Sequence, residues 1–235
     1  MSKILVTPID YMGTDLTVVN AARVSFNKRS FWKQRDSTVE EYREEGWGYP
    51  HEATGNLEER DVKLIKYLAK HKHISPFGHC FASFHVKAPI FVARQLVKHK
   101  FLRWNEVSRR YVDDEPEFFI PESWRAKAEN VKQGSGDDCE KQGFPTACRQ
   151  EIEELALDVY GDLLFHGVCP EQARMLLPQS VMTEWHWSGS LDAFADMCRL
   201  RLDPHTQYES QLVARQVDAC MSERFPISWN ALINA

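Results

Sequence analysis

The chain is organised around residues 94–111, Arg94-Gln95-Leu96-Val97-Lys98-His99-Lys100-Phe101-Leu102-Arg103-Trp104-Asn105-Glu106-Val107-Ser108-Arg109-Arg110-Tyr111. This stretch holds six Lys or Arg residues and one Glu, whereas the whole chain of 235 residues has a formal net charge of −5. A concentrated positive patch on an acidic protein indicates a site for a small anion more than a surface for a polyanion.

A strand and a helix lead into this basic stretch. Residues 80–87 alternate between apolar and polar side chains, which predicts a half-buried strand. Pro89 suits the first position of a helix, and no helix breaker follows it before Val97. On that helix Arg94, Gln95 and Lys98 share one stripe. The sequence therefore predicts that several hydrogen-bond donors point to one place.

Lys98, His99 and Lys100 also have a simpler explanation. They lie where the helix should end, and cations there complement the negative end of the helix macrodipole. For any one of the three residues this structural explanation is sufficient. The whole set, with the polar run that continues to Tyr111, favours a binding site.

The same residues resemble the signature of a known family. Lys98-His99-Lys100, followed by Asn105-Glu106-x-Ser108-x-Arg110-Tyr111, is similar to the signature of the flavin-dependent thymidylate synthases, Arg-His-Arg and then Ser-x-Asn-Glu-x-Ser-x-Arg-Tyr. The resemblance spans nearly the whole chain. Further blocks in the family order are Ala22-Arg23-Val24-Ser25-Phe26, Ser75-Pro76-Phe77-Gly78-His79, residues 87–95, Lys132-Gln133-Gly134-Ser135 and Arg174-Met175-Leu176-Leu177-Pro178.

The resemblance implies an α/β (α+β) fold, in which one sheet is flanked by helices. It implies a single domain over residues 1–235, with irregular insertions near residues 28–60 and 112–148. It also implies a homotetramer with active sites between subunits, which the sequence alone does not reveal.

Two chemical routes lead to methylation of a uracil at C5. In the first, a cysteine attacks C6, which needs a thiolate of low pKa; the nearest candidate is Cys80, beside His79, whose place in the strand pattern favours core packing. In the second, implied by the resemblance, reduced FAD delivers a hydride. The expected reaction is then dUMP to dTMP, with 5,10-methylenetetrahydrofolate as carbon donor and NADPH as reductant of FAD.

The resemblance assigns a role to each residue of the expected site. Arg201 is the expected catalytic residue, because it falls on the apolar stripe of a predicted helix and matches an arginine that contacts the uracil ring. The residues expected to bind dUMP are Gln95, Lys98, Glu106, Ser108, Arg110, Arg174 and Arg201. The residues expected to bind FAD are Ser75, Lys98, His99, Lys100, Glu106, Ser190 and Asp196.

The chain also departs from the family pattern. Lysines replace both outer arginines of the signature, so positive charge stays but the planar bidentate fork is lost. Arg103 and Gly78 stand where the family usually has serine and glutamate. Ser190-Leu191-Asp192 and Asp196 stand where the family often has Asn-x-Arg and Asn.

Composition excludes several classes. No apolar run approaches the ~20 residues of a membrane-spanning helix, and the pattern of the N-terminus predicts a first strand more than a signal segment. The six cysteines contain no Cys-x-x-Cys pair, so zinc spacing is absent and reduced thiols in a cytoplasm are expected. His71, His73, His79 and His85 have no carboxylate at ligand spacing, so no metal is expected.

Periodicity and capping signals predict the remaining elements. Residues 149–165 form an expected helix whose buried stripe is Ile152, Leu155, Val159 and Leu163. The other expected elements are a helix capped by Asp15, a helix within 57–70, a short helix at 124–130, a flexible loop at 133–137, a strand at 182–187, a helix capped by Ser190, and a last helix that begins at Asp203-Pro204.

Other interpretations remain open. Aromatic residues interleave with the cations between Lys98 and Tyr111, as in a nucleic-acid-binding module, but the acidic net charge opposes that interpretation. A catalytically drifted nucleotide-binding oligomer would explain the altered flavin positions. Among enzymes, the alternative is the same chemistry on another pyrimidine nucleotide, such as dCMP methylation or hydroxymethylation.

Overall fold

The computed structural model describes residues 3–33, 55–129 and 134–235. Most of the expected insertion at 28–60 lies outside these residues. Four antiparallel strands form the central sheet in the order β1-β2-β6-β3. Their bounds are β1 Leu5–Met12, β2 Phe81–Pro89, β3 Leu102–Glu106 and β6 Met182–Ser190.

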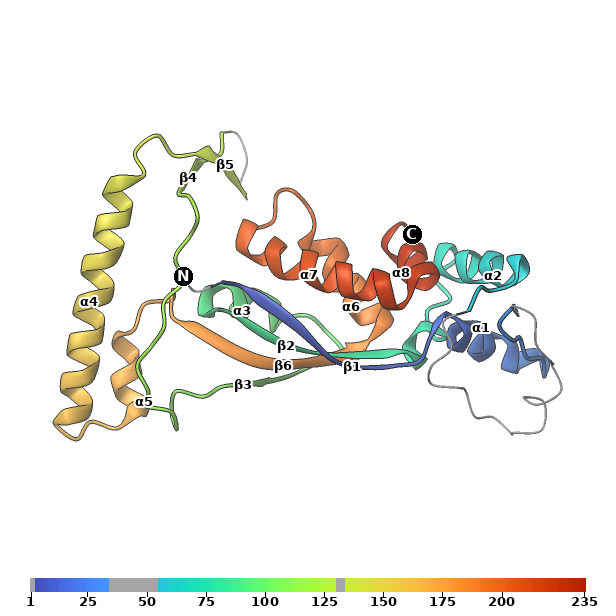
Figure 1. The fold of residues 1–235 in the computed structure, drawn as a ribbon, viewed down its shortest axis with the longest axis horizontal. Coiled ribbons are helices and arrows are strands. Elements are labelled where there is room, and N and C mark those ends of the chain that lie inside the picture. Colours follow the sequence, from blue (N-terminus) through green and yellow to red (C-terminus); the bar gives the residue numbers. More distant parts are fainter. Residues whose placement is uncertain (1–2, 34–54, 130–133) are drawn as a thin grey trace.

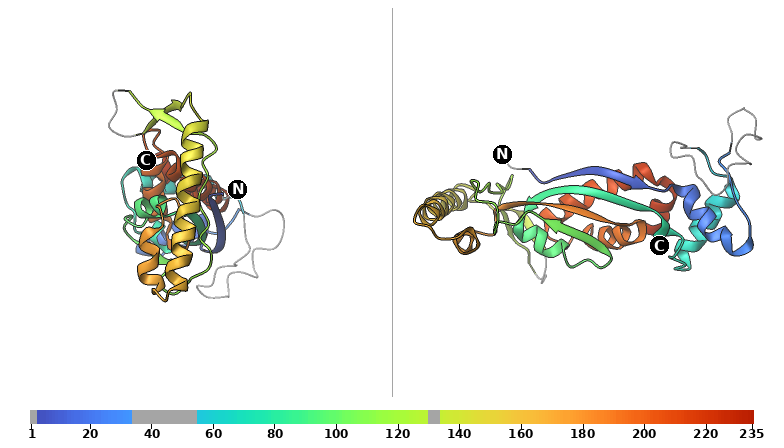
Figure 2. Two further views of the ribbon diagram at one scale, coloured as in Figure 1. Left: turned by 90° about the vertical axis from the view of Figure 1, so that its left-hand side faces the viewer. Right: turned by 90° about the horizontal axis from the view of Figure 1, so that it is seen from below.

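Helices cover one face of this sheet (Figure 1). These helices are α3 Ile90–Leu96, α6 Leu191–Arg201, α7 Tyr208–Arg224 and α8 Pro226–Ile233. At one end of the sheet lie α1 Asp15–Arg23 and α2 Glu59–Lys70, with the short 3-10 helices η1 Val24–Phe26 and η2 Phe77–His79. The view from below shows the strands in front and α6, α7 and α8 behind them (Figure 2, right).

The alternating pattern of β2 explains why one face is covered. Cys80, Ala82, Phe84 and Val86 are at most 1% exposed, whereas the side chains between them reach the other face. On the covered face Phe84 packs edge-on against Phe194 of α6, with ring centroids 5.2 Å apart. The predicted fold, a sheet flanked by helices, is confirmed; because the strands are antiparallel, it is of the α+β kind.

A separate arm projects from one end of the sheet (Figure 1; Figure 2, left). It consists of β4 Arg125–Lys127, β5 Ser135–Asp138, α4 Gly143–Phe165, α5 Pro170–Ala173 and the 3-10 helix η3 Arg174–Leu176. The prediction of a short helix at 124–130 was wrong, because β4 pairs with β5 there. Residues 135–137, expected as loop, belong to β5 for the same reason.

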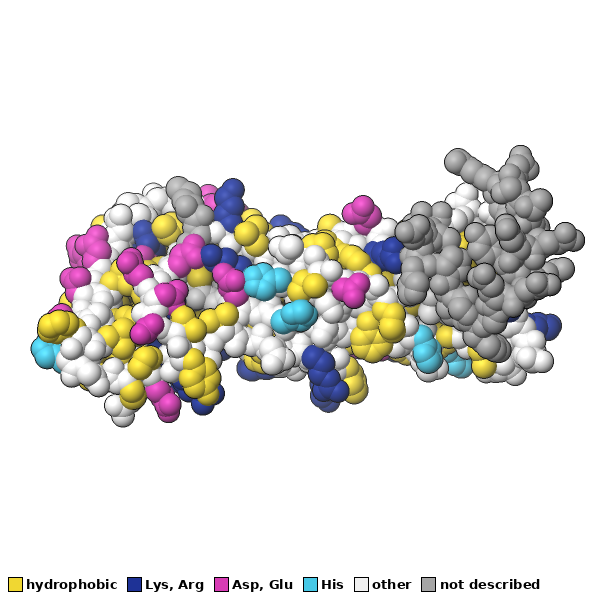
Figure 3. Space-filling model, turned by 60° about the horizontal axis from the view of Figure 1, so that its bottom comes forward, with side chains coloured by type: hydrophobic (Ala, Val, Ile, Leu, Met, Phe, Trp, Pro, Cys, Tyr) yellow, Lys and Arg dark blue, Asp and Glu magenta, His cyan; other side chains and the backbone are white. Residues whose placement is uncertain are grey.

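The C-terminal end of α4 was predicted correctly, but the helix begins at Gly143, six residues before the predicted start, and its buried face was wrong. Ile152 and Leu155, expected inside, are 58% and 64% exposed, whereas Glu153, Ala156 and Tyr160 are buried. Helix α4 packs against α5 and η3 within the arm, and this packing leaves the apolar residues Ile152 and Leu155 uncovered. In the space-filling view, hydrophobic side chains lie among acidic ones at this end of the molecule (Figure 3).

Two of the three expected caps were placed wrongly. Thr14, not Asp15, is the N-cap of α1. Ser190 is the N-cap of α6, as predicted, but its side chain makes no capping hydrogen bond. The last part of the chain forms two helices, and α7 begins at Tyr208 behind Gln207. The Asp203 carboxylate instead accepts a hydrogen bond from the His205 N–H at 2.7 Å, which closes a turn.

Pro89 is the final residue of β2 and the N-cap of α3, one position earlier than predicted. Therefore β2 runs directly into α3. Gln95, in the last turn of α3, contacts the start of α7, and His99, in the turn after α3, contacts α6. In the described part of the chain, no helix is long and apolar enough to cross a membrane.

Candidate active site

Three of the predicted site residues meet where α3, α6 and α7 converge. The Arg201 Nε–H donates to His99 Nε2 at 2.9 Å, and Arg201 Nη2 donates to the Gln95 carbonyl oxygen at 2.8 Å. The Gln95 side chain bonds in turn to Gln207, and its Oε1 accepts from Ser210 Oγ at 3.2 Å. We call these five residues the α3–α6–α7 cluster.

Burial makes this cluster electrostatically unusual. Partial burial, reinforced by the positive charge of Arg201 and opposed by Asp196, lowers the pKa of His99 to about 4. Burial also lowers the pKa of Arg201, although a guanidinium remains charged at physiological pH. The cluster therefore combines a neutral imidazole with a partly desolvated cation.

Lys98 and Lys100 flank His99 and are both exposed. Within the part of the chain that the structure describes, neither ammonium group makes an ion pair. Arg94, one turn before Lys98, is exposed as well. The sequence thus places three accessible cations beside the cluster, ready for an anionic ligand.

Some of the predicted flavin-binding residues lie along α6. The turn that holds Ser75 leads into η2, and the Leu191 N–H at the start of α6 donates to the Cys80 carbonyl at 2.8 Å, just after η2. Ser190 therefore lies near that turn. Asp196, midway along α6, pairs with Arg199 and acts electrostatically on His99. Helix α6 therefore begins beside the turn that holds Ser75 and ends at Arg201 in the α3–α6–α7 cluster, with a rise of about 1.5 Å per residue between them.

The remaining predicted residues lie elsewhere in the chain. Glu106, at the end of β3, accepts hydrogen bonds from Trp104 Nε1 at 3.0 Å and Thr183 Oγ1 at 2.9 Å. Ser108 and Arg110 follow it and contact one another. Arg174, in the arm, donates to the Glu171 carbonyl at 3.2 Å. Among the described residues, none of these groups bonds to the α3–α6–α7 cluster.

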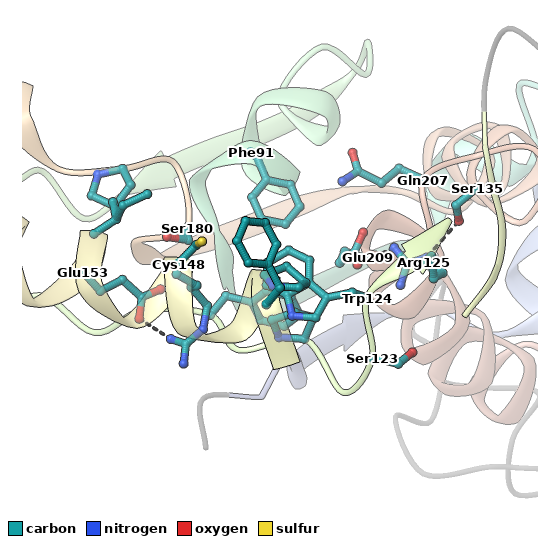
Figure 4. Close-up of a pocket in the computed structure, with 17 residues that line it drawn as sticks. Phe91, Ser123, Trp124, Arg125, Ser135, Cys148, Glu153, Ser180, Gln207 and Glu209 are labelled. Atoms are coloured by element: carbon teal, nitrogen blue, oxygen red, sulfur yellow. Dashed lines mark hydrogen bonds and ion pairs between the residues drawn. The ribbon is translucent and has the colours of Figure 1, made fainter. Parts of the chain in front are cut away.

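A cavity of about 640 Å³ lies between the arm and α3 (Figure 4). Its walls include Phe91 and Trp124, and the buried carboxylate of Glu209 pairs with Arg125 at 2.6 Å. Gln207 lines the cavity and belongs to the α3–α6–α7 cluster, so the two are adjacent. Such an aromatic lining with a few buried polar groups suits a flat ring.

Cys80 does not have the properties of a nucleophile. It is fully buried, and its thiol donates to the Thr14 carbonyl at 3.5 Å. Burial, followed by the nearby Asp15 carboxylate, raises the pKa of Cys80 to about 12. The expected packing role is therefore supported, and the thiol stays protonated at neutral pH. In the described ranges, no group of three His, Cys, Asp or Glu residues could hold a metal.

Sequence reasoning missed Gln207 and Ser210. Both lie at the start of α7, which the sequence placed further upstream because Asp203-Pro204 is a strong capping signal. The spacing of the two residues by three positions at a helix start places them on one face. That pattern was visible in the sequence, but only the packing of α7 against α3 shows that it faces Gln95.

An α+β fold with a half-buried arginine, a neutral histidine and flanking exposed cations defines an enzyme for an anionic substrate. The family described as Thymidylate synthase complementing protein matches residues 8–227. A flavin-dependent thymidylate synthase of Thermus thermophilus is 36% identical over 232 residues, which cover 98% of this chain and 76% of the relative. That of Kosmotoga olearia is 36% identical over 230 residues, covering 96% and 88%.

A solved structure agrees with these relatives. PolB from Streptomyces cacaoi, a UMP/dUMP methylase bound with 5-Br UMP, has a TM-score of 0.80 with this chain and 26% sequence identity, covering 100% of this chain and 95% of that one. The chain belongs to the family of flavin-dependent thymidylate synthases.

Proposed function

We propose that this enzyme methylates dUMP reductively to dTMP, with 5,10-methylenetetrahydrofolate as carbon donor and NADPH-reduced FAD as hydride carrier. Family membership supports this proposal. The structural observation that carries it is the convergence of Gln95, His99 and Arg201 beside the exposed Lys98. This arrangement offers an amide and a guanidinium for a pyrimidine ring and a cation for its phosphate.

Arg201 is poised to stabilise negative charge on the uracil. Its Nε donates to His99, just after α3, and its Nη2 donates to the Gln95 carbonyl oxygen in α3; among the described residues Nη1 has no hydrogen-bond partner. A preorganised donor in a partly dry site stabilises charge that develops during reaction. Gln95, Lys98 and Arg201 would bind dUMP from this side, and Glu106, Ser108, Arg110 and Arg174 would complete the site.

The residues present fit FAD. Lys98 and Lys100 are free to pair with its phosphates. Near Ser75, the buried Asp192 Oδ1 has no hydrogen-bond partner in the described chain, and a methyl group at Gly78 would lie 3.9 Å from it. This acceptor suits a hydroxyl or amino group of the cofactor. His99, Glu106, Ser190 and Asp196 are the other proposed contacts, and bound FAD would supply hydride transfer.

A homotetramer with shared active sites would account for the separation of the proposed site residues. Arg201 lies in the α3–α6–α7 cluster, whereas Arg174 lies in the arm and Arg110 follows β3. The arm also exposes Ile152 and Leu155, and such apolar patches mark contact surfaces. We therefore propose that a second copy brings the missing residues to each cluster. No nucleic acid or membrane partner is proposed.

A cytoplasmic location is also part of the proposal. All six cysteines are free, and unpaired thiols are typical of a reducing compartment.

The first test is cofactor binding. Purified protein titrated with FAD should show a shift of the flavin absorbance bands. Supplied with NADPH and 5,10-methylenetetrahydrofolate, the loaded protein should convert dUMP to dTMP and release tetrahydrofolate. Absence of binding at saturating FAD would exclude a flavin enzyme. Stoichiometric dihydrofolate would instead indicate a cysteine mechanism. Parallel reactions with dCMP and UMP test the choice of pyrimidine nucleotide.

A further inference from the structure

We propose that His99 is a positioning residue for Arg201, and that it acts as the neutral imidazole protonated on Nδ1. This inference rests on the proposed function for its catalytic meaning, since Arg201 is the residue that would stabilise the uracil. The assignment of His99 itself comes from the geometry of the α3–α6–α7 cluster.

The hydrogen bond between the two side chains determines the tautomer. A guanidinium has five N–H donors and no acceptor. The Arg201 Nε–H points at His99 Nε2 over 2.9 Å, so Nε2 must carry a lone pair and not a proton. A neutral histidine with an unprotonated Nε2 has its proton on Nδ1.

The charges around His99 favour the same state. Arg201 faces it from α6, and Lys98 and Lys100 are its neighbours in the chain. Asp196, also on α6, is the acidic group that acts on it, but that carboxylate already pairs with Arg199. Burial first, and then the positive charge of Arg201, disfavour a charged imidazolium at this position, so the pKa of His99 is lowered to about 4.

The hydrogen bond from Arg201 to His99 restricts the orientation of the arginine side chain. His99 Nε2 and the Gln95 carbonyl oxygen accept from two different nitrogens of the same guanidinium. Because the guanidinium is rigid and planar, hydrogen bonds to these two acceptors fix the orientation of its plane. The third nitrogen, Nη1, then points away from both acceptors. The histidine between two lysines thus orients the arginine of α6 without adding charge.

The tautomer is tested on flavin-free protein, so the result does not depend on catalysis. Protein labelled with ¹⁵N-histidine is titrated from pH 8 to pH 5.5, and the His99 signals are assigned by their loss in His99→Gln. We expect an unprotonated Nε2 and a protonated Nδ1 throughout this range. An imidazolium at pH 7, or the opposite tautomer, would overturn the proposal.

Two amide variants then test positioning. Glutamine places an acceptor near the position of Nε2, whereas asparagine reaches only the position of Nδ1. His99→Gln should therefore retain at least about tenfold more turnover than His99→Asn, with FAD absorbance measured for both. In the Arg201→Lys background this difference should shrink, because coupled residues are non-additive. Equal turnover of the two amide variants in both backgrounds would show that the acceptor is irrelevant.

The histidine signals and the turnover measurements together distinguish failure of the proposed function from failure of the positioning role of His99. If the wild type makes no dTMP but shows the expected histidine signals, the proposed function fails and the structural assignment stands. If it makes dTMP with a charged His99, the positioning role fails and the function stands.

Discussion

Arg201 shows how one residue depends on its surroundings. It ends α6 on the same face as Leu191, Phe194 and Cys198, which are fully buried. A cation on such a stripe needs polar partners, and it finds them in His99 and the Gln95 carbonyl. The side chain is thereby held in a site where one donor is worth roughly 3–4 kcal/mol of charge stabilisation.

Arg201→Lys should lower turnover with dUMP by about 100-fold while FAD remains bound. Lysine keeps the charge but loses the planar donor set that meets two acceptors at once. Steady-state kinetics and flavin absorbance measure both effects. Unchanged turnover would show that Arg201 neither contacts nor activates the uracil.

Cys80→Ala should retain turnover, and native Cys80 should resist alkylation by iodoacetamide at pH 8. With its pKa raised to about 12 by burial, the thiol is almost wholly protonated at that pH and has no access to solvent. Mass spectrometry of the alkylated peptides, with the exposed Cys169 as internal control, measures the reactivity. A Cys80→Ala variant that folds but has no turnover would contradict hydride transfer from FAD without a cysteine nucleophile.

At the scale of elements, α1 and α8 are joined by one carboxylate. The two Asp15 oxygens accept from the backbone N–H groups of Ile227 at 3.0 Å and Ser228 at 2.8 Å, at the start of α8. Helix N-termini leave these donors without intrahelical partners. Asp15 is 4% exposed, so a residue expected to cap its own helix caps a distant one instead.

Asp15→Ala should lower the free energy of unfolding by about 2 kcal/mol, because it removes a cap and leaves the buried Ser228 N–H and the partly buried Ile227 N–H unpaired. Denaturant unfolding followed by circular dichroism measures this loss. Asp158→Ala, on the exposed surface of α4, is the matched control and should change stability by less than about 0.5 kcal/mol. Equal losses in the two variants would mean that the cap contributes nothing.

At the scale of the whole molecule, the residues proposed to bind dUMP are divided between regions. The α3–α6–α7 cluster lies on the helix-covered side, whereas Arg174 belongs to the arm. One chain is expected to be insufficient, so activity should depend on assembly. Symmetric oligomers supply such shared sites through repeated interfaces.

Mixing two inactive variants tests this dependence. Arg201→Ala and Arg174→Ala, dissociated together and reassembled, should recover about a quarter of wild-type activity if two chains build each site and pair at random. Each variant reassembled alone is the control. Recovery no greater than the sum of the controls would place both residues in the same chain's site, and light scattering would report the oligomeric state.

The sequence by itself determined the elements whose patterns are local. Alternation predicted β2 and β6, and helical spacing predicted α2, α4 and α6, because these periods follow directly from backbone geometry. The signature at Lys98–Tyr111 indicated the family, and that assignment is confirmed. The residue types of such a signature and the spacing between them are visible in the sequence before the fold is known.

Tertiary structure decided what depends on contacts between distant residues. The sequence predicted the apolar stripe of α4 but not that the stripe is exposed, because burial depends on which element packs against it. β4 and β5 form only by pairing with one another. Likewise, the neutral state of His99 follows from its burial and from the approach of Arg201, 102 residues further along the chain. Burial and neighbouring charge set a pKa, and only the folded chain brings them together.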